Sequence, residues 1–407
     1  MRKFSLFTVL LSVLLAAVLL FSGCAVKVNA ENLMANVVPQ PVDLPDDLSA
    51  GNRAMTDLAV RLLQKAPAGN TMISPVSILT VLALLQNGAD KETLAELEAL
   101  TGLSTDELNG YLAAYTASLL SDKGVRLHAL NSLWINEDPD FTPDQSYLQT
   151  AADYYQPGIY KAVFDQKTVD EINRWCKKNT DGMIPTIIDE LPDDTVMCLI
   201  NALVFDGKWE KKYEKKDVFS GIFTKEDGTV LTKDFMYSEG ERYFESEDAA
   251  AFSKYYEGSH YAFVGILPKE GTTLSAYLSS LTGDKLRALL TSSMGSAAVY
   301  LPKFSAETSL NLKEIFAFDL PHAFDGDTAD FSRMGSVKSG NLYVNTFLHK
   351  TFIDVSENGT KAAAITFAGM GKATAAMPRI LRLDRPFLYM IIDTQNNQPL
   401  FIGTFNG

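Results

Sequence analysis

The residues with the most distinctive chemistry lie near the C-terminus, in two strand-like segments joined by a turn. Residues 344–355 are rich in apolar and β-branched side chains, and Asn358-Gly359 supplies a hairpin signal because both residues tolerate positive φ angles. The arm that follows is nearly uncharged up to Pro378, and one strand face of it holds only small residues: Thr360, Ala362, Ala364, Thr366 and Ala368. Such an arm can exist in water as a loop or be buried in a sheet. Its chemistry is therefore that of a segment that can exchange strand partners.

Side chains typical of enzyme active sites are sparse in this sequence. It contains neither a G-x-S-x-G motif nor a phosphate-binding loop, and no metal-binding spacing links its four histidines, which are His128, His260, His322 and His349. His128 belongs to an apolar strand-like segment and His322 follows a proline, so structural roles are favoured for both. We expect no metal ion, no cofactor and no enzymatic activity.

Cysteine usage argues against a disulfide-stabilised fold. Only Cys176 and Cys198 follow the N-terminal leader, whereas an exported disulfide-rich protein carries a denser, even set. Cys176 lies on a predicted helix, at helical spacing from Ile172, and Cys198 lies in an apolar run. Both are predicted to be buried thiols, and the fold is predicted to be stabilised by its hydrophobic core.

Composition and charge narrow the possible partners. Hydrophobic residues make up 46% of the 407 residues and charged residues 21%, which is typical of a globular protein. The formal net charge is −14, and the densest basic stretch, residues 208–216, is interleaved with Glu210 and Glu214. A stretch of this kind is typical of a solvated surface and does not neutralise phosphates. The sequence therefore argues against nucleic-acid binding.

The N-terminus has the features of an export leader. Arg2-Lys3 precede an apolar run over residues 4–21, and Ser22-Gly23-Cys24 follow it. Ser-Gly-Cys resembles the lipobox of bacterial lipoproteins, although Phe21 stands where that pattern usually has leucine. We expect a signal peptide over residues 1–23 and lipidation of Cys24, which would place the protein on the outer face of the cell membrane. An uncleaved membrane anchor and a secreted protein are the alternatives.

The rest of the chain is predicted to form a short linker and one domain. Residues 24–48 show no sustained periodicity and are predicted to be a lipidated N-terminus and linker. Residues 49–407 contain no internal repeat and no low-complexity segment. Helical periodicity dominates their first third, over residues 52–63, 76–85, 91–100 and 106–120, and strand-like runs follow at 125–135, 195–205, 229–236, 261–267, 297–304, 387–393 and 399–405. Later helices are predicted at 144–155, 169–178, 274–281, 284–291 and 310–315. This order indicates an α+β fold with antiparallel or mixed sheets.

Several motifs in this domain resemble those of the serpin family, the serine protease inhibitors. They occur in the family's order: Ser74-Pro75-Val76-Ser77 with residues 82–89, residues 201–210, residues 301–304 with 310–313, His349-Lys350 with residues 355–364, and residues 385–389 with 399–403. The resemblance covers about residues 50–407. It implies three β-sheets, eight or nine helices and an exposed reactive-centre loop.

Members of this family act as suicide substrates. A serine protease attacks the loop and forms an acyl-enzyme, and the cleaved loop then inserts as a central strand of the main sheet, which distorts the protease before deacylation. The resemblance places the start of this loop, its hinge, at Glu357, Gly359, Thr360, Ala362, Ala363 and Ala364. We call residues 357–378 the reactive loop. The implied partner is a serine protease, and we expect the inhibitor to be a monomer.

The residues of the hinge permit insertion. An unpaired charge buried in the sheet would oppose it by several kcal/mol, and a proline would remove a ladder hydrogen bond. The inward positions of the hinge carry neither a charge nor a proline. In the alternating pattern of a strand, Lys361 is predicted to face outward into solvent. The sequence therefore favours an inhibitor. The alternative is a serpin fold used without inhibition, as a surface binding protein or a simple protease substrate.

The scissile bond is predicted from the family's spacing. Counting forward from Glu357 gives Ala373, with cleavage before Thr374, whereas counting back from the end of the loop favours Ala375-Ala376. Either alternative presents a small side chain, which suits the shallow pockets of elastase-like or subtilisin-like proteases. Lys372 would instead suit a trypsin-like protease. The sequence does not decide whether cysteine proteases are also trapped.

Four further residues match a conformational gate of the family. Ser74, Asn201 and His349 correspond to a polar cluster beneath the main sheet, where its strands part during insertion. The resemblance implies a hydrogen-bond network that holds the sheet closed. Trp209 corresponds to an aromatic residue near the point where the loop first enters. Without the resemblance, the three polar residues would be buried groups that need partners, and Trp209 would be a core residue.

Overall fold

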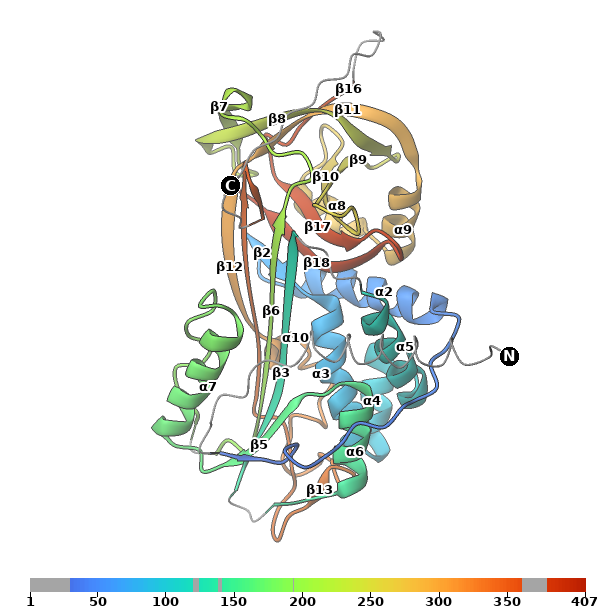
Figure 1. Cartoon of the computed structure of the whole chain (residues 1–407), viewed down its shortest axis with the longest axis vertical. Helices are drawn as coiled ribbons and strands as arrows, with labels where there is room; N and C mark the ends of the chain where they lie inside the picture. The colour runs from blue at the N-terminus through green and yellow to red at the C-terminus, as the bar shows by residue number, and fades with distance from the viewer. Residues whose placement is uncertain (1–29, 120–123, 138–140, 193, 361–378) are drawn as a thin grey trace, which may run out of the picture.

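The structure is a computed structural model that describes residues 30–119, 124–137, 141–192, 194–360 and 379–407. In Figure 1, one sheet runs along the molecule with most helices on its right, and a second sheet closes the upper end. Among the described residues there are nine α-helices and three sheets. The predicted α+β fold with three sheets is confirmed.

The main sheet contains seven strands and positions the hinge. Their order is β1–β5–β3–β6–β15–β14–β12, with bounds β1 (Glu31–Asn32), β5 (Gly158–Ala162), β3 (Val125–Asn136), β6 (Met197–Lys208), β15 (Gly359–Thr360), β14 (Thr346–Ser356) and β12 (Phe304–Asn311). Below the short strand β15, strands β6 and β14 pair directly and in parallel, from Cys198 opposite Thr346 to Val204 opposite Phe352. We call this parallel contact the seam.

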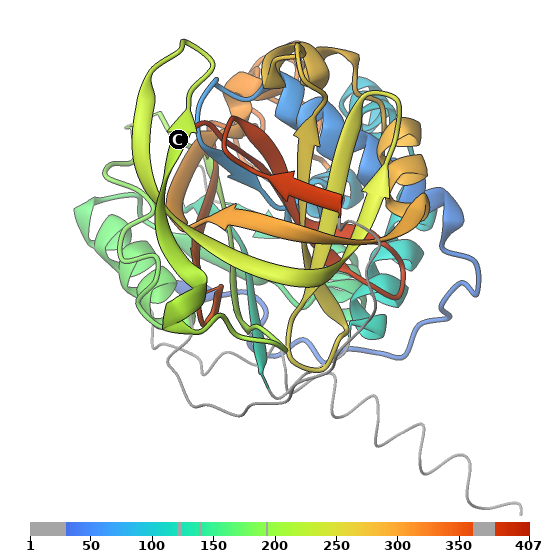
Figure 2. The same ribbon diagram turned by 90° about the horizontal axis from the view of Figure 1, so that it is seen from above.

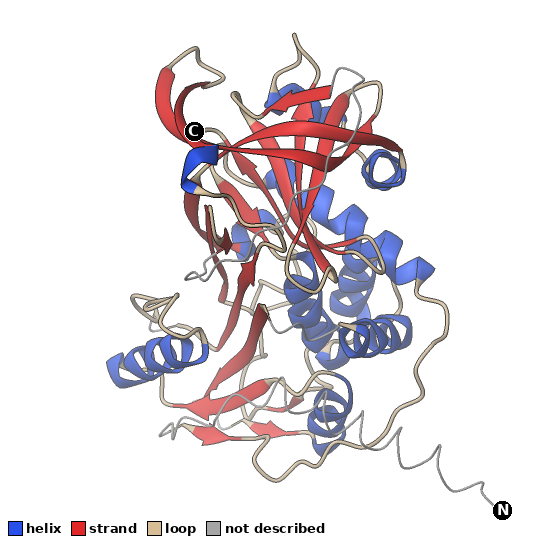
Figure 3. Cartoon of the chain, turned by 45° about the horizontal axis from the view of Figure 1, so that its top comes forward, coloured by secondary structure: helices blue, strands red, loops and turns tan. Residues whose placement is uncertain are grey.

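Strand β6 is buried on both faces, which explains its continuous apolar sequence. Cys198, Ile200, Ala202 and Val204 face a core beneath helix α7 (Gln166–Asn179), together with Ile172 and Trp175 of that helix. The alternate residues Leu199, Leu203 and Phe205 belong to the larger core on the other face. Figure 3 shows α7 apart from the other helices, on its own side of the sheet.

The second sheet contains nine strands and curls across the end of the molecule, as Figure 2 shows from above. Its order is β16–β11–β8–β9–β10–β17–β18–β2, with β7 paired to β8. The bounds are β16 (Arg379–Arg382), β11 (Ser293–Pro302), β8 (Val230–Glu245), β9 (Ala249–Tyr255), β10 (Tyr261–Pro268), β17 (Phe387–Asp393), β18 (Gln398–Phe405), β2 (Thr71–Ile73) and β7 (Val218–Thr224). A third, two-stranded sheet pairs β4 (Thr142–Pro143) with β13 (Gly335–Ser336).

On the side of the main sheet opposite α7, several helices pack against a long, buried helix, α3 (Pro75–Gly88). Its start follows the sequence signal, because the Ser74 side chain accepts a hydrogen bond from the Ser77 N–H and Pro75 occupies the first helical position. The other helices are α2 (Ser49–Lys65), α4 (Lys91–Thr101), α5 (Thr105–Ser118), α6 (Gln145–Tyr154), α8 (Leu274–Ser280), α9 (Gly283–Thr291), α10 (Leu312–Ile315) and the 3₁₀ helix η1 (Lys215–Asp217).

Cys176 and Cys198 are free and buried, as predicted from the sequence. Burial raises the pKa of both thiols well above the ordinary value, so each remains a neutral, unreactive thiol.

The structure revises the expected linker in its C-terminal part. Residues 30–48 lie along the body of the protein, and Glu31–Asn32 form a strand on the edge of the main sheet. A two-residue strand has no periodicity that sequence analysis could detect. The predicted signal peptide and Cys24 lie outside the described residues, and within the described ranges no helix is long and apolar enough to span a bilayer.

Candidate functional site

The hinge begins inside the main sheet. Gly359 and Thr360 form β15, which lies between the upper ends of β6 and β14 and pairs antiparallel with both. Thr360 is opposite Gly207 on one side and Val355 on the other, and it is fully buried. Two residues of the hinge thus already occupy the position of a central strand.

Gly359 is required by the close approach of the backbones at this point. Its φ angle is +148°, and a Cβ atom there would lie 2.1 Å from the carbonyl oxygen of Gly207. No side chain fits at that distance. The Asn-Gly signal in the sequence therefore marks a position where β15 is wedged against β6.

An aromatic platform, Trp209 and Tyr256, holds the hinge in place. The two rings stack with centroids 4.5 Å apart, and the Tyr256 hydroxyl hydrogen-bonds Thr360 Oγ1 at 2.6 Å. The Trp209 indole N–H donates to the carbonyl of Ser356 at 2.8 Å, and its backbone N–H donates to the carbonyl of Asn358 at 3.1 Å. Trp209 thus connects the end of β6 to the end of β14 across β15.

Two ion pairs flank this platform. Lys303 lies 2.7 Å from Glu357 and, by hydrogen bonding to it, lowers the pKa of that carboxyl. Beneath the platform, the buried Lys254 pairs with Glu241 at 2.7 Å, and its ammonium lies 4.5 Å from the centre of the Tyr213 ring. A buried cation needs such partners, because it would otherwise lose its hydration without compensation.

The predicted gate residues meet halfway down the seam. His349 on β14 lies opposite Asn201 on β6, and its ring is fully buried. The backbone N–H of Ser74 donates to His349 Nε2 at 3.1 Å, so Nε2 is unprotonated. Nδ1 therefore carries the proton and donates it to the side-chain oxygen of Asn201. This bond joins the two strands across the seam.

The Asn201 amide extends this network to two residues that sequence analysis missed. It donates to the Ser77 carbonyl at 2.8 Å and to Asn131 Oδ1 at 2.6 Å. Ser77 lies within the Ser-Pro motif, but nothing in the sequence marks Asn131, which comes from β3. All hydrogen bonds of this network form when β6 and β14 are paired. Separating the two strands removes Asn201 as the partner of the buried His349.

The platform and the ion pairs beside it include residues that no motif had singled out. Tyr213, Tyr256, Lys254 and Lys303 come from three separate regions of the chain and meet only because the second sheet lies over the end of the first. The remaining predicted residues lie outside the described ranges: Ala362, Ala363, Ala364, Lys372, Ala373, Thr374, Ala375, Ala376 and Cys24.

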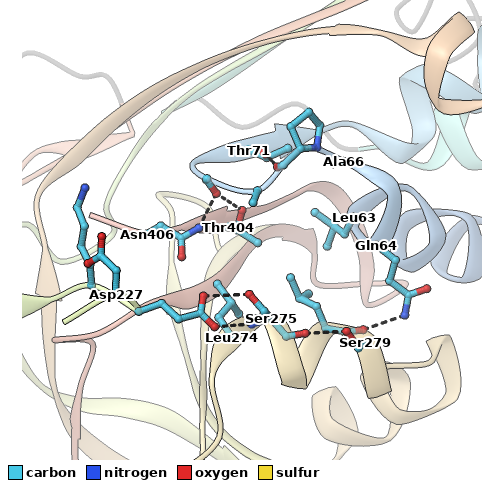
Figure 4. A pocket seen from close by; sticks show the side chains of 16 residues that line it. Leu63, Gln64, Ala66, Thr71, Asp227, Leu274, Ser275, Ser279, Thr404 and Asn406 are labelled. Carbon is cyan, nitrogen blue, oxygen red and sulfur yellow. Dashed lines mark hydrogen bonds between the residues drawn. The ribbon is translucent and has the colours of Figure 1, made fainter. Parts of the chain in front are cut away.

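A separate hollow of about 630 Å³ lies between the end of α2, α8 and β18 (Figure 4). Its polar groups mostly satisfy one another: Ser275 donates to Glu226, and Thr404 and Asn406 donate to Gly69. No histidine or cysteine lines it. Across the described part of the chain, no cluster of histidine, cysteine and carboxylate side chains has the arrangement of a metal site. The hinge and the gate are therefore the stronger candidate site.

Comparison with known proteins finds a matching family for most of the chain. A protein-family model described as Serpin (serine protease inhibitor) matches residues 49–407. An uncharacterised serpin-like protein of Thermococcus kodakarensis is 30% identical over 357 residues, which cover 84% of this chain and 82% of the relative. Serpin B8 of Homo sapiens is 29% identical, with 89% of this chain and 99% of the relative covered.

A solved structure shares the fold over most of the chain. The thermophilic serpin tengpin in its native state is 40% identical and superposes with a TM-score of 0.88, covering 93% of this chain and all of tengpin. The latent state of the same protein gives a TM-score of 0.77 at 38% identity, with 91% of this chain covered. The present structure is thus more similar to the native state.

The gate predicts a pH-dependent stability that depends on His349. Burial lowers the pKa of His349 to about 3 from an ordinary value of 6.5, so below pH 6.5 the unfolded chain takes up the proton first. Stability is therefore lost as the pH falls from 6.5 toward 3, with a loss of about 2 kcal/mol at pH 5. We expect His349→Gln to unfold with a smaller difference in free energy between pH 7 and pH 5, reduced by that amount. Urea unfolding at the two pH values measures this difference.

His322→Gln is the control for this prediction. A hydrogen bond to Glu96 raises the pKa of His322, so protonation of this residue stabilises the native state as the pH falls. Removing His322 therefore cannot reduce the loss of stability between pH 7 and pH 5. An equal reduction in both variants would refute the assignment to His349.

The close approach at Gly359 predicts a position-specific loss of stability. Gly359→Ala should expel β15 from its position and lower the free energy of unfolding by about 1–3 kcal/mol, because positive φ strain and a clash with Gly207 act together. Gly228→Ala is the matched control, since Gly228 has a φ angle of +84° with nothing within 4 Å. Calorimetric unfolding should show the larger loss at Gly359. Equal losses would mean that β15 is not wedged against β6.

Proposed function

The chain belongs to the serpin family, whose members are generally protease inhibitors rather than enzymes, and from this premise we propose that it is a suicide-substrate inhibitor of serine endopeptidases. One observation carries the proposal. Gly359 and Thr360 already lie between β6 and β14, in line with the path that an inserting strand would follow.

The seam supplies the driving force. Insertion replaces the single parallel ladder between β6 and β14 with two ladders, and antiparallel pairing is slightly more stable per residue. Each added ladder hydrogen bond contributes about 1 kcal/mol net, so the gain of about a dozen such bonds is comparable to the 5–15 kcal/mol stability of an ordinary domain. This free energy is sufficient to distort a protease that remains bound to the loop as an acyl-enzyme.

The hinge and the gate control when this free energy is released. Thr360 has already entered, so insertion continues from an existing strand and does not require a new nucleus. The gate opposes it, because the next strand must separate His349 from Asn201. Cleavage of the loop removes the constraint at its far end and lets the strand advance through the gate.

The target and the location are part of the same proposal. A small residue at Ala373 or Ala375 favours an elastase-like or subtilisin-like target, and a cysteine protease remains a further candidate target. The Ser-Gly-Cys motif supports lipidation of Cys24 and a position on the outer face of the cell membrane. A protease that reaches the cell surface would then meet the inhibitor there.

The proposal is tested by the fate of an elastase-type protease. We expect an SDS-stable complex with the intact inhibitor and a large rise in melting temperature after loop cleavage. Thr360→Arg should give rapid cleavage without a complex, because a charge buried against Tyr256 opposes insertion by about 3–5 kcal/mol. Gel electrophoresis and calorimetry measure both effects.

Thr229→Arg, in an exposed turn, is the control and should leave complex formation intact. Rapid cleavage of the unmodified protein without a complex and without a stability gain would instead identify a non-inhibitory serpin or a simple substrate.

The scissile bond predicts a change in target. Ala373→Arg should raise the association rate with a trypsin-like protease at least about tenfold, because a cationic side chain then enters a pocket that bears a carboxylate. Mass spectrometry of the released C-terminal fragment identifies the bond. If Lys372→Ala, rather than Ala373→Arg, changes the rate with trypsin, cleavage occurs after Lys372.

A further inference from the structure

The N-terminal strap, residues 30–48, is fastened to the body along its length. At its start, Glu31 and Asn32 pair with Lys161 and Tyr160 of β5, and the Leu33 N–H donates to the Ile159 carbonyl at 2.9 Å. The Glu31 carboxylate lies 3.2 Å from the Lys161 ammonium. The strap therefore adds one more strand to the edge of the main sheet.

Further contacts continue toward α2. The side chains of Leu33, Met34, Val37 and Leu48 pack against the main core. The Gln40 N–H donates to Asp153 Oδ1 at 2.7 Å, and the Gln149 amide donates to the Val38 carbonyl at 3.0 Å. Both partners belong to α6, so the strap is held by a sheet edge, a helix and the core. It does not behave as a free linker between residue 30 and the domain.

The strap begins at the end of the main sheet that lies opposite the hinge. Both positions can be compared along β6. Strand β5 pairs with the part of β3 that lies opposite Met197 and Cys198 of β6, whereas Thr360 pairs with Gly207 near the other end of β6. Nine strand residues separate these levels of β6, which corresponds to about 30 Å. In Figure 1, β5 lies at the bottom and β16, which follows the reactive loop, at the top.

The length of the remaining tether follows from the sequence. Only six residue steps separate Cys24 from Ala30, so they reach at most about 21 Å. With a free linker up to residue 48, the same anchor would reach about 85 Å and would leave the domain free to tumble. Docking of the strap shortens the tether by most of its length.

We propose that the N-terminal strap orients the anchored protein on a lipid surface, with the β1–β5 end toward the membrane and the reactive loop facing outward. The inference rests on the proposed lipidation of Cys24. Apolar side chains are exposed at this end: Val38 on the strap is 67% exposed, and Val163, directly after β5, is 56% exposed. These side chains suit contact with the membrane interface. The loop is held where an approaching protease reaches it first.

Fluorescence energy transfer to labelled lipids tests this orientation. A dye is attached to the lipidated protein through Val163→Cys, at the proposed membrane end, or through Ser220→Cys on β7, at the upper end. Cys176 and Cys198 do not take up the label, because they are buried and their pKa values are raised. On lipid vesicles, we expect several-fold stronger transfer from position 163 than from position 220.

Two variants separate the strap from the anchor. Leu33→Asp with Met34→Asp should release the strap and make the two transfer efficiencies similar, whereas Ala35→Asp with Asn36→Asp, at exposed strap positions, should preserve the difference. Because the double variant could also unfold the domain, a Gly-Ser insertion between Asn29 and Ala30 provides a second test. It lengthens the tether without touching the strap, and it should also reduce the difference.

The outcomes are distinguishable from failure of the proposed function. Equal transfer from both positions in the unmodified protein overturns the orientation, even if elastase is still trapped. Absence of radiolabelled palmitate from the protein, with Cys24→Ser as the negative control, overturns the anchor and the orientation together. Failure to trap elastase while position 163 still gives the stronger transfer leaves the orientation intact and overturns only the inhibitory function.

Discussion

The parallel seam between β6 and β14 is the contact on which the rest of the structure depends. It is the only direct pairing between the two halves of the main sheet in the described residues, and seven residue pairs form it. Parallel pairing is buried on both faces, and here α7 covers one face and α3 supports the other. The insertion proposed above would place a new strand at this contact, between the two halves of the sheet.

The hinge above the seam and the gate at its middle are controlled by different physical interactions. At the hinge, aromatic stacking and backbone hydrogen bonds from Trp209 hold β15 in an entered position. At the gate, His349 and Asn201 form a buried polar network that is fully paired only when the strands touch. Opening the gate would leave polar groups without partners in a medium of low dielectric. The polar network therefore resists partial opening and favours an all-or-none transition.

Local sequence signals predicted much of this architecture. Ser74-Pro75 marked the start of α3, the Asn358-Gly359 pair marked the turn into β15, and the two cysteines were recognised as buried thiols. Other elements were missed for physical reasons. β7 and β9 have short, mixed patterns, and residues 310–311, expected to be helical, continue β12 because pairing with β14 outweighs their helical propensity.

The sequence by itself determined which segment is predicted to change partners, because the small side chains, the low charge and the absence of proline before Pro378 are local properties of the arm that begins at Thr360. The tertiary structure alone decided what surrounds the start of this arm, at Gly359 and Thr360. Tyr256, Lys254 and Asn131 reach the hinge and the gate only because distant strands pair in a particular register, and the strap is positioned by the edge of β5, by α6 and by the core. Such contacts depend on neighbours in space, and no spacing along the chain records them.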